Sequence, residues 1–220
     1  MKKHSPEDSW FHNDELLQCV ADLFLAGTDT SSNTISWAVS VLLHFPDLQT
    51  KLFEEISSKT GEKPPAVEHR QELPLLQAFI QEILRCFTIA PLSLQHKTSA
   101  DVEIGGCFIP KHTLILTNLY AAHHDPKTWK DPTTFNIYRH IDKDGKFVPS
   151  KKVISFGIGA RSCLGEKLGR IEIFLFLANI IKTFEILPDP KSNRLPSIDR
   201  GIAGFLYIPY PFKVVMKSRI

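Results

Sequence analysis

Cysteine is scarce in this sequence, and its placement excludes two common kinds of site. The 220 residues include 4 cysteines, and no two of them form a C-x-x-C pair: Cys19, Cys86, Cys107 and Cys163. A zinc site of the usual spacing is therefore not expected, and a chain of this length is not a disulfide scaffold. We expect reduced thiols, as in a protein that faces the cytosol.

The sequence also lacks an excess of one charge and a long hydrophobic run. Its net charge is +2, and 43% of its residues are hydrophobic, a composition typical of globular proteins. No concentrated basic face is apparent, so no nucleic-acid partner is expected. The most apolar stretch, residues 16–26, is short and contains Asp22, so no transmembrane segment is expected. Residues 1–13 are polar and carry acids, which predicts neither a signal peptide nor an anchor.

Apolar periodicity and the positions of proline and glycine predict a mainly α chain with small β-sheets (α+β). The longest helix is expected over residues 14–44, because no proline follows before Pro46. Apolar residues cover nearly all its faces, which is typical of a helix at the centre of a large protein. Other helices are expected from Pro46 to Gly61, over 75–87, and from Cys163 to about 184.

Short strands are expected over residues 92–119 and 205–216, with a hairpin turn at Gly105-Gly106. Residues 123–149 are predicted to be irregular, and a long irregular stretch inside a compact domain is usually functional. No linker divides the chain, so residues 1–220 are treated as part of one domain.

The segment FGIGARSCLG, residues 156–165, is the most informative part of the sequence. Its glycines allow a tight loop that can aim several N–H groups at one sulfur. Cys163 precedes an amphipathic helix, whose dipole lowers the pKa of a thiol and favours the thiolate. Arg161 supplies a cation suited to a carboxylate, and Phe156 an apolar cover. Considered alone, such a cysteine is compatible with a structural thiol, a reactive thiol or a metal ligand.

A nucleotide site at this loop is excluded. Gly157 and Gly159 have the spacing of a nucleotide-binding loop, but the third glycine falls at Gly165. That position does not satisfy G-x-G-x-x-G, and no G-x-x-x-x-G-K-[ST] is present.

Two other polar patterns lie on predicted helices. In AGTDT, residues 26–30, the Thr30 hydroxyl can bond to the Ala26 carbonyl, bending the helix and opening a groove. A tolerated kink and an oxygen-binding groove with a proton relay through Asp29 and Thr30 are equally compatible with these residues. Glu82 and Arg85 form E-x-x-R, which places both on one helix face, as in many solvated ion pairs.

The loop matches F-x-x-G-x-R-x-C-x-G at every fixed position, and so resembles the haem loop of the cytochrome P450 superfamily. The AGTDT segment is similar to the family's [AG]-G-x-[DE]-T pattern, and E-x-x-R is also a family feature. The resemblance covers the chain from about Val20 onward and is strongest to animal microsomal members. It implies the C-terminal portion of the P450 fold, with the N-terminal half absent.

The resemblance also implies roles for individual residues. Cys163 would be the axial ligand to the iron of haem b, and Asp29 with Thr30 would assist protonation of bound oxygen. His96 and Arg161 would contact the haem propionates. Further haem contacts would come from Ala26, Phe156, Gly157 and Gly165. Glu82, Arg85 and Arg139 would form a structural ion-pair network. Substrate contacts would come from Ile89, Ala90, Leu92, Ile202 and Phe205.

The sequence departs from the family pattern at three positions. Ile137 replaces a proline and His140 a phenylalanine near Arg139, which leaves the local backbone path open. His112 replaces a glycine, and must then enter a left-handed turn at some cost. The HHD segment at 123–125 does not predict a metal cluster, because adjacent side chains point in different directions. By resemblance, it is interpreted as the start of the family's meander.

By resemblance, the protein inserts one oxygen atom from O2 into a lipophilic substrate. Electrons would come from NADPH through a cytochrome reductase, with cytochrome b5 as a further partner, at the cytosolic face of the endoplasmic reticulum. Two alternatives remain. A haem-thiolate isomerase or dehydratase needs no proton relay, so Asp29 and Thr30 argue against it. The other is a truncated, non-catalytic fragment.

Overall fold

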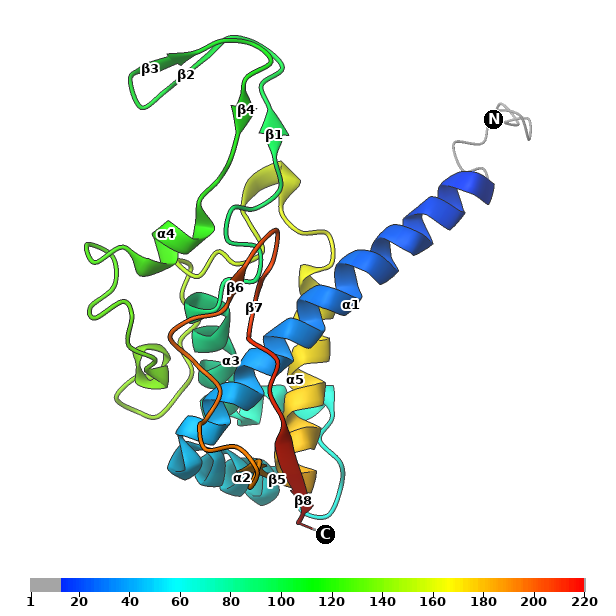
Figure 1. Cartoon of the computed structure of the whole chain (residues 1–220), viewed down its shortest axis with the longest axis vertical. Helices are drawn as coiled ribbons and strands as arrows, with labels where there is room; N and C mark the ends of the chain where they lie inside the picture. Colours follow the sequence, from blue (N-terminus) through cyan, green and yellow to red (C-terminus); the bar gives the residue numbers. More distant parts are fainter. Residues whose placement is uncertain (1–12, 220) are drawn as a thin grey trace.

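The computed structural model describes residues 13–219. The prediction that residues 1–13 are neither a signal peptide nor an anchor falls almost entirely outside this part. The described chain is an α+β structure, as predicted, with five α-helices: α1 (Asn13–His44), α2 (Pro46–Thr60), α3 (Pro74–Cys86), α4 (Leu119–His124) and α5 (Glu166–Thr183). Figure 1 shows α1 crossing the molecule diagonally, with its N-terminal half extending away from the other helices.

Proline and glycine set the helix boundaries that the sequence predicted. Pro46 and Pro74 occupy the first turns of α2 and α3, where their missing N–H groups cost nothing. Gly61 ends α2 with φ of 55°, and its N–H donates to the Ser57 carbonyl at 3.0 Å. Helix α4 was not predicted. The Asn118 side chain caps it by accepting from the Ala121 N–H at 2.9 Å.

Four small antiparallel sheets of two strands each complete the described fold. Strand β1 (His96–Lys97) pairs with β4 (Leu114–Ile115), and β2 (Val102–Ile104) with β3 (Cys107–Ile109). The β2–β3 turn at Gly105-Gly106 confirms the predicted hairpin, with φ of 58° and 79°. His112 does enter the left-handed region, with φ of 70°. Near the C-terminus, β6 (Ile202–Ala203) pairs with β7 (Tyr207–Ile208).

Strand β5 (Phe184–Pro188) was not predicted. It begins where the expected helix was to end, and pairs along its whole length with β8 (Val214–Ser218). Three short 3-10 helices also lie in the described chain, at Val67–Glu72, Ile137–His140 and Gly159–Arg161.

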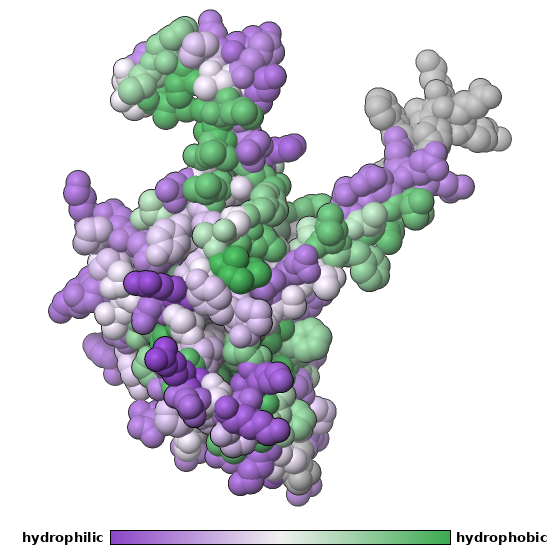
Figure 2. Space-filling model, viewed as in Figure 1, coloured by the Kyte–Doolittle hydropathy of each residue, from purple (hydrophilic) through white to green (hydrophobic). Residues whose placement is uncertain are grey.

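The hydrophobic core lies where the C-terminal half of α1 meets α2, α3 and α5. Trp37 of α1 is fully buried and stacks on Phe87 and Tyr207, with ring centroids 4.3 and 5.3 Å apart. The N-terminal half of α1 keeps its apolar side chains exposed within the described chain, with Phe24 at 73% exposure, so this long apolar helix is not surrounded here. Figure 2 shows this apolar stripe and a second one on the arm that carries β2 and β3.

No helix within residues 13–219 combines the length and apolar character needed to cross a membrane.

Gly201 allows the β6–β7 hairpin to lie against α1, and this contact gives a first prediction. A Cβ at Gly201 would lie 2.5 Å from the Ile208 carbonyl oxygen and 2.6 Å from the Trp37 ring. We expect Gly201→Ala to lower the free energy of unfolding by about 1–3 kcal/mol, because both groups are held in place. Gly204→Ala is the control, since its Cβ meets only the Leu206 carbonyl at 3.6 Å. Chemical denaturation measures both, and equal stabilities would contradict this account.

Candidate functional site

The cysteine loop is closed by backbone hydrogen bonds that depend on two glycines. Gly157 and Gly159 have φ of 74° and 81°, a region that residues with a side chain rarely enter. The Gly157 N–H donates to the Ile154 carbonyl at 2.8 Å, and the Cys163 N–H donates to the Phe156 carbonyl at 2.8 Å. These bonds fold the loop back on itself and bring Cys163 next to the N-terminus of α5.

Cys163 is accessible and lies among exposed apolar side chains. Its thiol is exposed, and the neighbouring Leu164 is 95% exposed. Ile158, on the same loop, is also exposed. Cys86 differs, because burial and the adjacent Glu82 carboxylate raise the pKa of its thiol well above the usual range. The loop therefore presents one accessible sulfur among unpaired apolar side chains.

The base of the loop is fixed to α5 through Phe156. The Arg170 guanidinium lies over the Phe156 ring, 4.7 Å from its centroid, and its Nε donates to Glu166 at 2.9 Å. A Cβ at Gly169 would lie 3.8 Å from the same ring. Phe156 thus packs against the first turns of α5 and holds the loop on the helix.

Arg161 and His96 remain available for an anionic group. Within residues 13–219, neither side chain makes a hydrogen bond or an ion pair, and Arg161 is exposed. Arg161 ends the 3-10 helix of the cysteine loop, and His96 begins β1. Figure 1 shows both segments at the same end of the molecule, beyond the N-terminus of α5.

The AGTDT segment lies in the exposed part of α1 and has the local bond that its sequence predicts. The Thr30 hydroxyl donates to the Ala26 carbonyl at 2.7 Å. The Asp29 carbonyl accepts from both Ser32 and Asn33, at 3.2 and 2.8 Å, so side chains compete for helix carbonyls here. The Asp29 carboxylate is itself exposed.

Ser31 joins this part of α1 to the helix that follows Cys163. Its hydroxyl donates to the Glu172 carboxylate of α5 at 3.3 Å. A Cβ at Gly27 would meet no atom within 4 Å, so this glycine leaves one side of α1 open.

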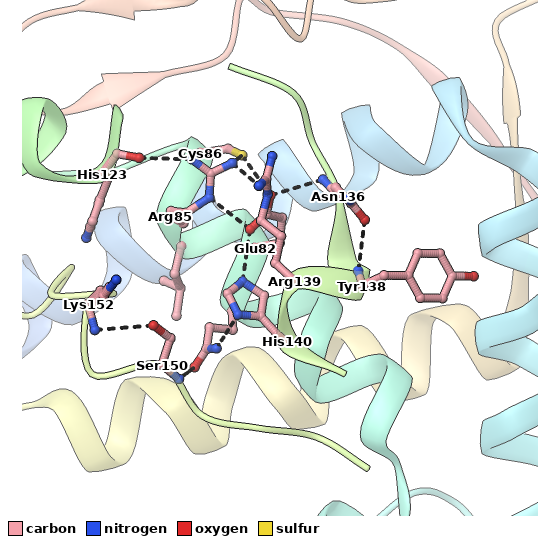
Figure 3. Close-up of polar contacts among 12 residues, drawn as sticks. Glu82, Arg85, Cys86, His123, Asn136, Tyr138, Arg139, His140, Ser150 and Lys152 are labelled. Atoms are coloured by element: carbon pink, nitrogen blue, oxygen red, sulfur yellow. Dashed lines mark hydrogen bonds and ion pairs between the residues drawn. The ribbon is translucent and has the colours of Figure 1, made fainter. Parts of the chain in front are cut away.

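Glu82 and Arg85 form a fully buried ion pair on α3, with both side chains at 0% exposure. Arg85 donates through two nitrogens, Nε to Oε2 at 2.9 Å and Nη2 to Oε1 at 2.7 Å (Figure 3). The Asn136 N–H donates to Oε1 at 3.0 Å, and Arg139 Nε lies 3.3 Å from the same oxygen, without the alignment of a hydrogen bond. The structure thus brings together the three residues predicted as a network.

The remaining donors of both arginines hold the irregular chain after α4. Arg85 donates to the carbonyls of His123, Pro132 and Thr134 at 2.9, 2.7 and 3.2 Å. Arg139 donates to the carbonyls of Lys130, Asp131 and Thr134. Burial raises the pKa of Glu82, but hydrogen bonds from Arg85 and His140 outweigh it and lower the pKa to about 2. The carboxylate therefore stays charged across the physiological range.

Sequence reasoning missed two buried histidines that belong to this region. The Ile154 N–H donates to His123 Nε2 at 2.8 Å, so the imidazole proton is on Nδ1, which lies 2.6 Å from the Thr88 hydroxyl. His140 lies 2.9 Å from Glu82 and 2.7 Å from Gln81. The HHD segment and the replacement of phenylalanine at 140 were the available signals, but their partners come from distant parts of the chain.

A backbone hydrogen bond joins two of the segments that carry the residues predicted as substrate contacts. The Tyr207 N–H donates to the Ile89 carbonyl at 2.7 Å, which joins the β6–β7 hairpin to the segment after α3. Ile202 pairs with Ile208 in that hairpin. Leu92, Ile202 and Phe205 are exposed and Ala90 is partly exposed. Ile89, in contrast, is buried in the core.

Comparison with known proteins identifies the family. The family model described as "Cytochrome P450" matches residues 1–216. The chain belongs to the cytochrome P450 family. It is similar to a steroid 17-alpha-hydroxylase/17,20 lyase from Squalus acanthias, with 39% identity over 98% of this chain and 42% of that protein. Cytochrome P450 2U1 from Bos taurus is 35% identical over 99% of this chain and 40% of that protein.

Cytochrome P450 1A1 from Pleuronectes platessa is 41% identical over 81% of this chain and 35% of that protein. The chain thus spans about two fifths of the length of the curated relatives it matches. Comparable identity to three differently named P450s supports the family and favours no single substrate.

The buried ion pair of this P450 gives a second prediction. We expect Arg85→Ala to lower the free energy of unfolding by about 3–5 kcal/mol, because it leaves the Glu82 carboxylate desolvated and poorly compensated. Lys217→Ala is the control, since Lys217 pairs with Glu185 at 3.5 Å and is mostly exposed. That loss should be below about 1 kcal/mol. Equal losses in a denaturant titration would show that the α3 pair has no special weight.

His123 gives a third prediction, on acid stability. Burial, with His124 and Arg85 nearby, lowers the pKa of His123 from 6.5 to about 4. The folded protein therefore binds this proton less well than the unfolded chain, and stability falls as pH drops from 6.5 towards 4. The contribution to the slope is at most about 1.4 kcal/mol per pH unit.

The matched variant is His123→Gln, whose amide oxygen can accept from the Ile154 N–H but does not titrate. Unfolding free energies measured at several pH values should show a flatter slope over this window in the variant. Parallel slopes for the two proteins would contradict a neutral, buried His123.

Proposed function

We propose that this protein is a haem-thiolate monooxygenase that inserts one oxygen atom from O2 into a lipophilic substrate, and that residues 1–220 supply its haem-binding part within a single domain. The observation that carries the proposal is the cysteine loop. It combines an accessible thiol at a helix N-terminus, two glycines with positive φ, and exposed apolar neighbours. Family membership supports the same conclusion, because it implies a haem cofactor.

The residues at the loop fit a haem group in their chemistry. Cys163 offers a sulfur ligand, Ile158 and Leu164 offer exposed apolar contacts, and Phe156 with Gly157 and Gly165 shapes the loop around the sulfur. Arg161 and His96 offer cationic or hydrogen-bonding partners for two propionates. Ala26 is exposed and directly precedes Gly27 on α1. A haem bound through a thiolate supplies the activation of O2, because the thiolate donates electron density that favours O–O cleavage.

The chain's own contribution to proton delivery would come from α1. Asp29 is exposed and can exchange a proton with water, and the Thr30 hydroxyl is held by Ala26 at 2.7 Å. A hydroxyl that donates to a carbonyl can still accept from a donor on its other side. Because a hydroxyl has one proton, Thr30 would turn from the Ala26 carbonyl to donate toward the oxygen site, and Asp29 would replenish that proton. A haem-thiolate isomerase or dehydratase would need neither residue.

The substrate site and partners are proposed at the level of chemical class. The exposed side chains of Leu92, Ile202 and Phe205, with Ala90, form an apolar surface that suits a lipophilic molecule. NADPH would supply electrons through a cytochrome reductase, with cytochrome b5 as a second partner. The animal microsomal relatives support a location at the cytosolic face of the endoplasmic reticulum membrane.

Comparing the activity of two protein samples distinguishes a non-catalytic product from a monooxygenase. The first is the 220-residue chain, whose exposed apolar stripe on α1 would leave a bound haem open to water. The second comes from the longest reading frame that contains these residues. We expect turnover with reductase and NADPH from the second sample, and no turnover from either one would support the non-catalytic alternative. Product formed without NADPH would support the isomerase.

The fourth prediction concerns the proposed ligand. In the protein from the longest reading frame, Cys163→Ser should abolish the absorbance spectrum typical of a reduced, carbon monoxide-bound haem-thiolate and the oxidative activity. Serine keeps the side-chain size but lacks the thiolate that binds iron. Cys107→Ser is the matched control, because Cys107 is also exposed but lies on the β2–β3 hairpin. Retention of spectrum and turnover by Cys163→Ser would overturn the proposal.

A further inference from the structure

His140 is fully buried beside the Glu82 carboxylate, at a position where the P450 pattern usually has phenylalanine. It ends the 3-10 helix Ile137–His140, directly after Arg139. Its Nε2 lies 2.9 Å from Glu82 Oε2, the oxygen that also accepts from Arg85 Nε at 2.9 Å. Arg139 approaches the other oxygen, Oε1. His140 is therefore a fourth member of the network that Glu82, Arg85 and Arg139 form, and it adds a contact that phenylalanine cannot make.

The hydrogen-bond partners determine where the imidazole proton lies. The Gln81 amide oxygen accepts from the Ser150 N–H at 3.3 Å, so the amide nitrogen of Gln81 faces His140 Nδ1 at 2.7 Å. An amide nitrogen only donates, so Nδ1 is the acceptor and Nε2 carries the proton that goes to Glu82. A proton on Nδ1 would place two donors against each other. In this arrangement His140 uses both ring nitrogens, Nε2 as a donor and Nδ1 as an acceptor.

His140 thus has two arms, the contact of Nε2 with Glu82 and the contact of Nδ1 with Gln81. The second arm leads toward the cysteine loop. Gln81 contacts the Val148 carbonyl at 3.5 Å as well as the Ser150 N–H, and the Val148 N–H donates to the His140 carbonyl at 2.9 Å. From Ser150 the chain passes through buried Val153 to Ile154, which begins the loop. The Ser155 hydroxyl donates to the Leu84 carbonyl of α3 at 2.8 Å. The segment is therefore attached to α3 at several points along its length.

We propose that His140 is a positioning residue: it joins the Glu82 ion-pair network to residues 148–150, and so fixes the segment that leads into the cysteine loop. Figure 3 shows the continuous path from Arg85 through Glu82 and His140 to Ser150. The hydrogen-bond bridge depends only on contacts within the chain. Its effect on haem retention rests on the proposed function.

The competing explanation is that His140 only fills space. Its ring meets Trp129 edge to face, with centroids 6.3 Å apart at 73°, and a phenylalanine could make the same contact. The polar atoms, not the volume, are therefore what the experiment must isolate.

Three substitutions separate the two arms. His140→Gln places an amide nitrogen near the position of Nε2 and keeps a donor to Glu82. His140→Asn places an amide oxygen near Nδ1 and keeps an acceptor for Gln81. His140→Phe keeps the volume and removes both. His112→Asn is the control, because His112 is exposed, lies far away in sequence on the β3–β4 connection, and has a φ that asparagine tolerates.

Two backbone amides report on the arms in the protein from the longest reading frame. The Asn136 N–H donates to Glu82 and the Ser150 N–H donates to Gln81. We expect exchange at Asn136 to rise about tenfold in the Asn and Phe variants, and exchange at Ser150 to rise about fivefold in the Gln and Phe variants. The His112 variant should match the unsubstituted protein. Nitrogen NMR of labelled histidine should find the His140 proton on Nε2.

Two results would overturn the proposal: a proton on Nδ1, or a Phe variant whose two amides exchange at the original rates. A uniform rise at both amides in all three variants would also overturn it, since that is the signature of lost packing. Transfer of haem to an excess of apomyoglobin then tests the loop, and we expect it to be several-fold faster in His140→Phe than in the control. If the unsubstituted protein binds no haem, the proposed function fails while the amide data still decide the bridge.

Discussion

The buried charge of Glu82 is the constraint on which the arrangement around the cysteine loop depends. A carboxylate at 0% exposure is costly unless its lone pairs are used. Here four hydrogen bonds reach it, two from Arg85, one from His140 and one from the Asn136 N–H, and Arg139 adds a nearby positive charge. The two arginines carry more donors than one carboxylate can accept. Their surplus N–H groups then need carbonyls, and the chain between His123 and Thr134 supplies them. The irregular segment between His123 and Thr134 is thus held in place by hydrogen bonds from the two arginines that pair with Glu82.

The same network explains how α3 positions a loop that it does not itself contain. Gln81, Leu84 and the His123–Thr88 pair take up polar groups of residues 150, 155 and 154 in turn. Each attachment is a single hydrogen bond of modest net value, but the buried groups would pay a larger penalty if left unpaired. The loop therefore gains its position from several weak attachments to α3 and to His123 of α4, which Thr88 contacts just after α3. Phe156 and Arg170 add the attachment to α5 from the other side.

Local sequence signals predicted much of the fold, and the reasons for the failures are physical. Proline and glycine gave the starts of α2 and α3 and the β2–β3 turn, because their effects act within a few residues. The Thr30 bond to Ala26 was likewise local. Strand β5 was missed because its partner β8 lies about thirty residues away, and pairing rather than propensity decides such a short strand. The roles of His123 and His140 were missed for the same reason, since Gln81, Thr88 and Ile154 are distant in sequence.

The distribution of burial separates what stabilises this chain from what it presents for chemistry. The C-terminal half of α1, with Trp37, lies in the core, whereas the half that carries Asp29 and Thr30 is exposed, like Cys163 and Leu164. Burial of apolar surface around Trp37 stabilises the fold, and this stability allows the part that carries Thr30 and Cys163 to remain exposed. The loop keeps its sulfur accessible beside the exposed Ile158 and Leu164 because backbone hydrogen bonds close it and contacts to α3 and α5 hold it in place.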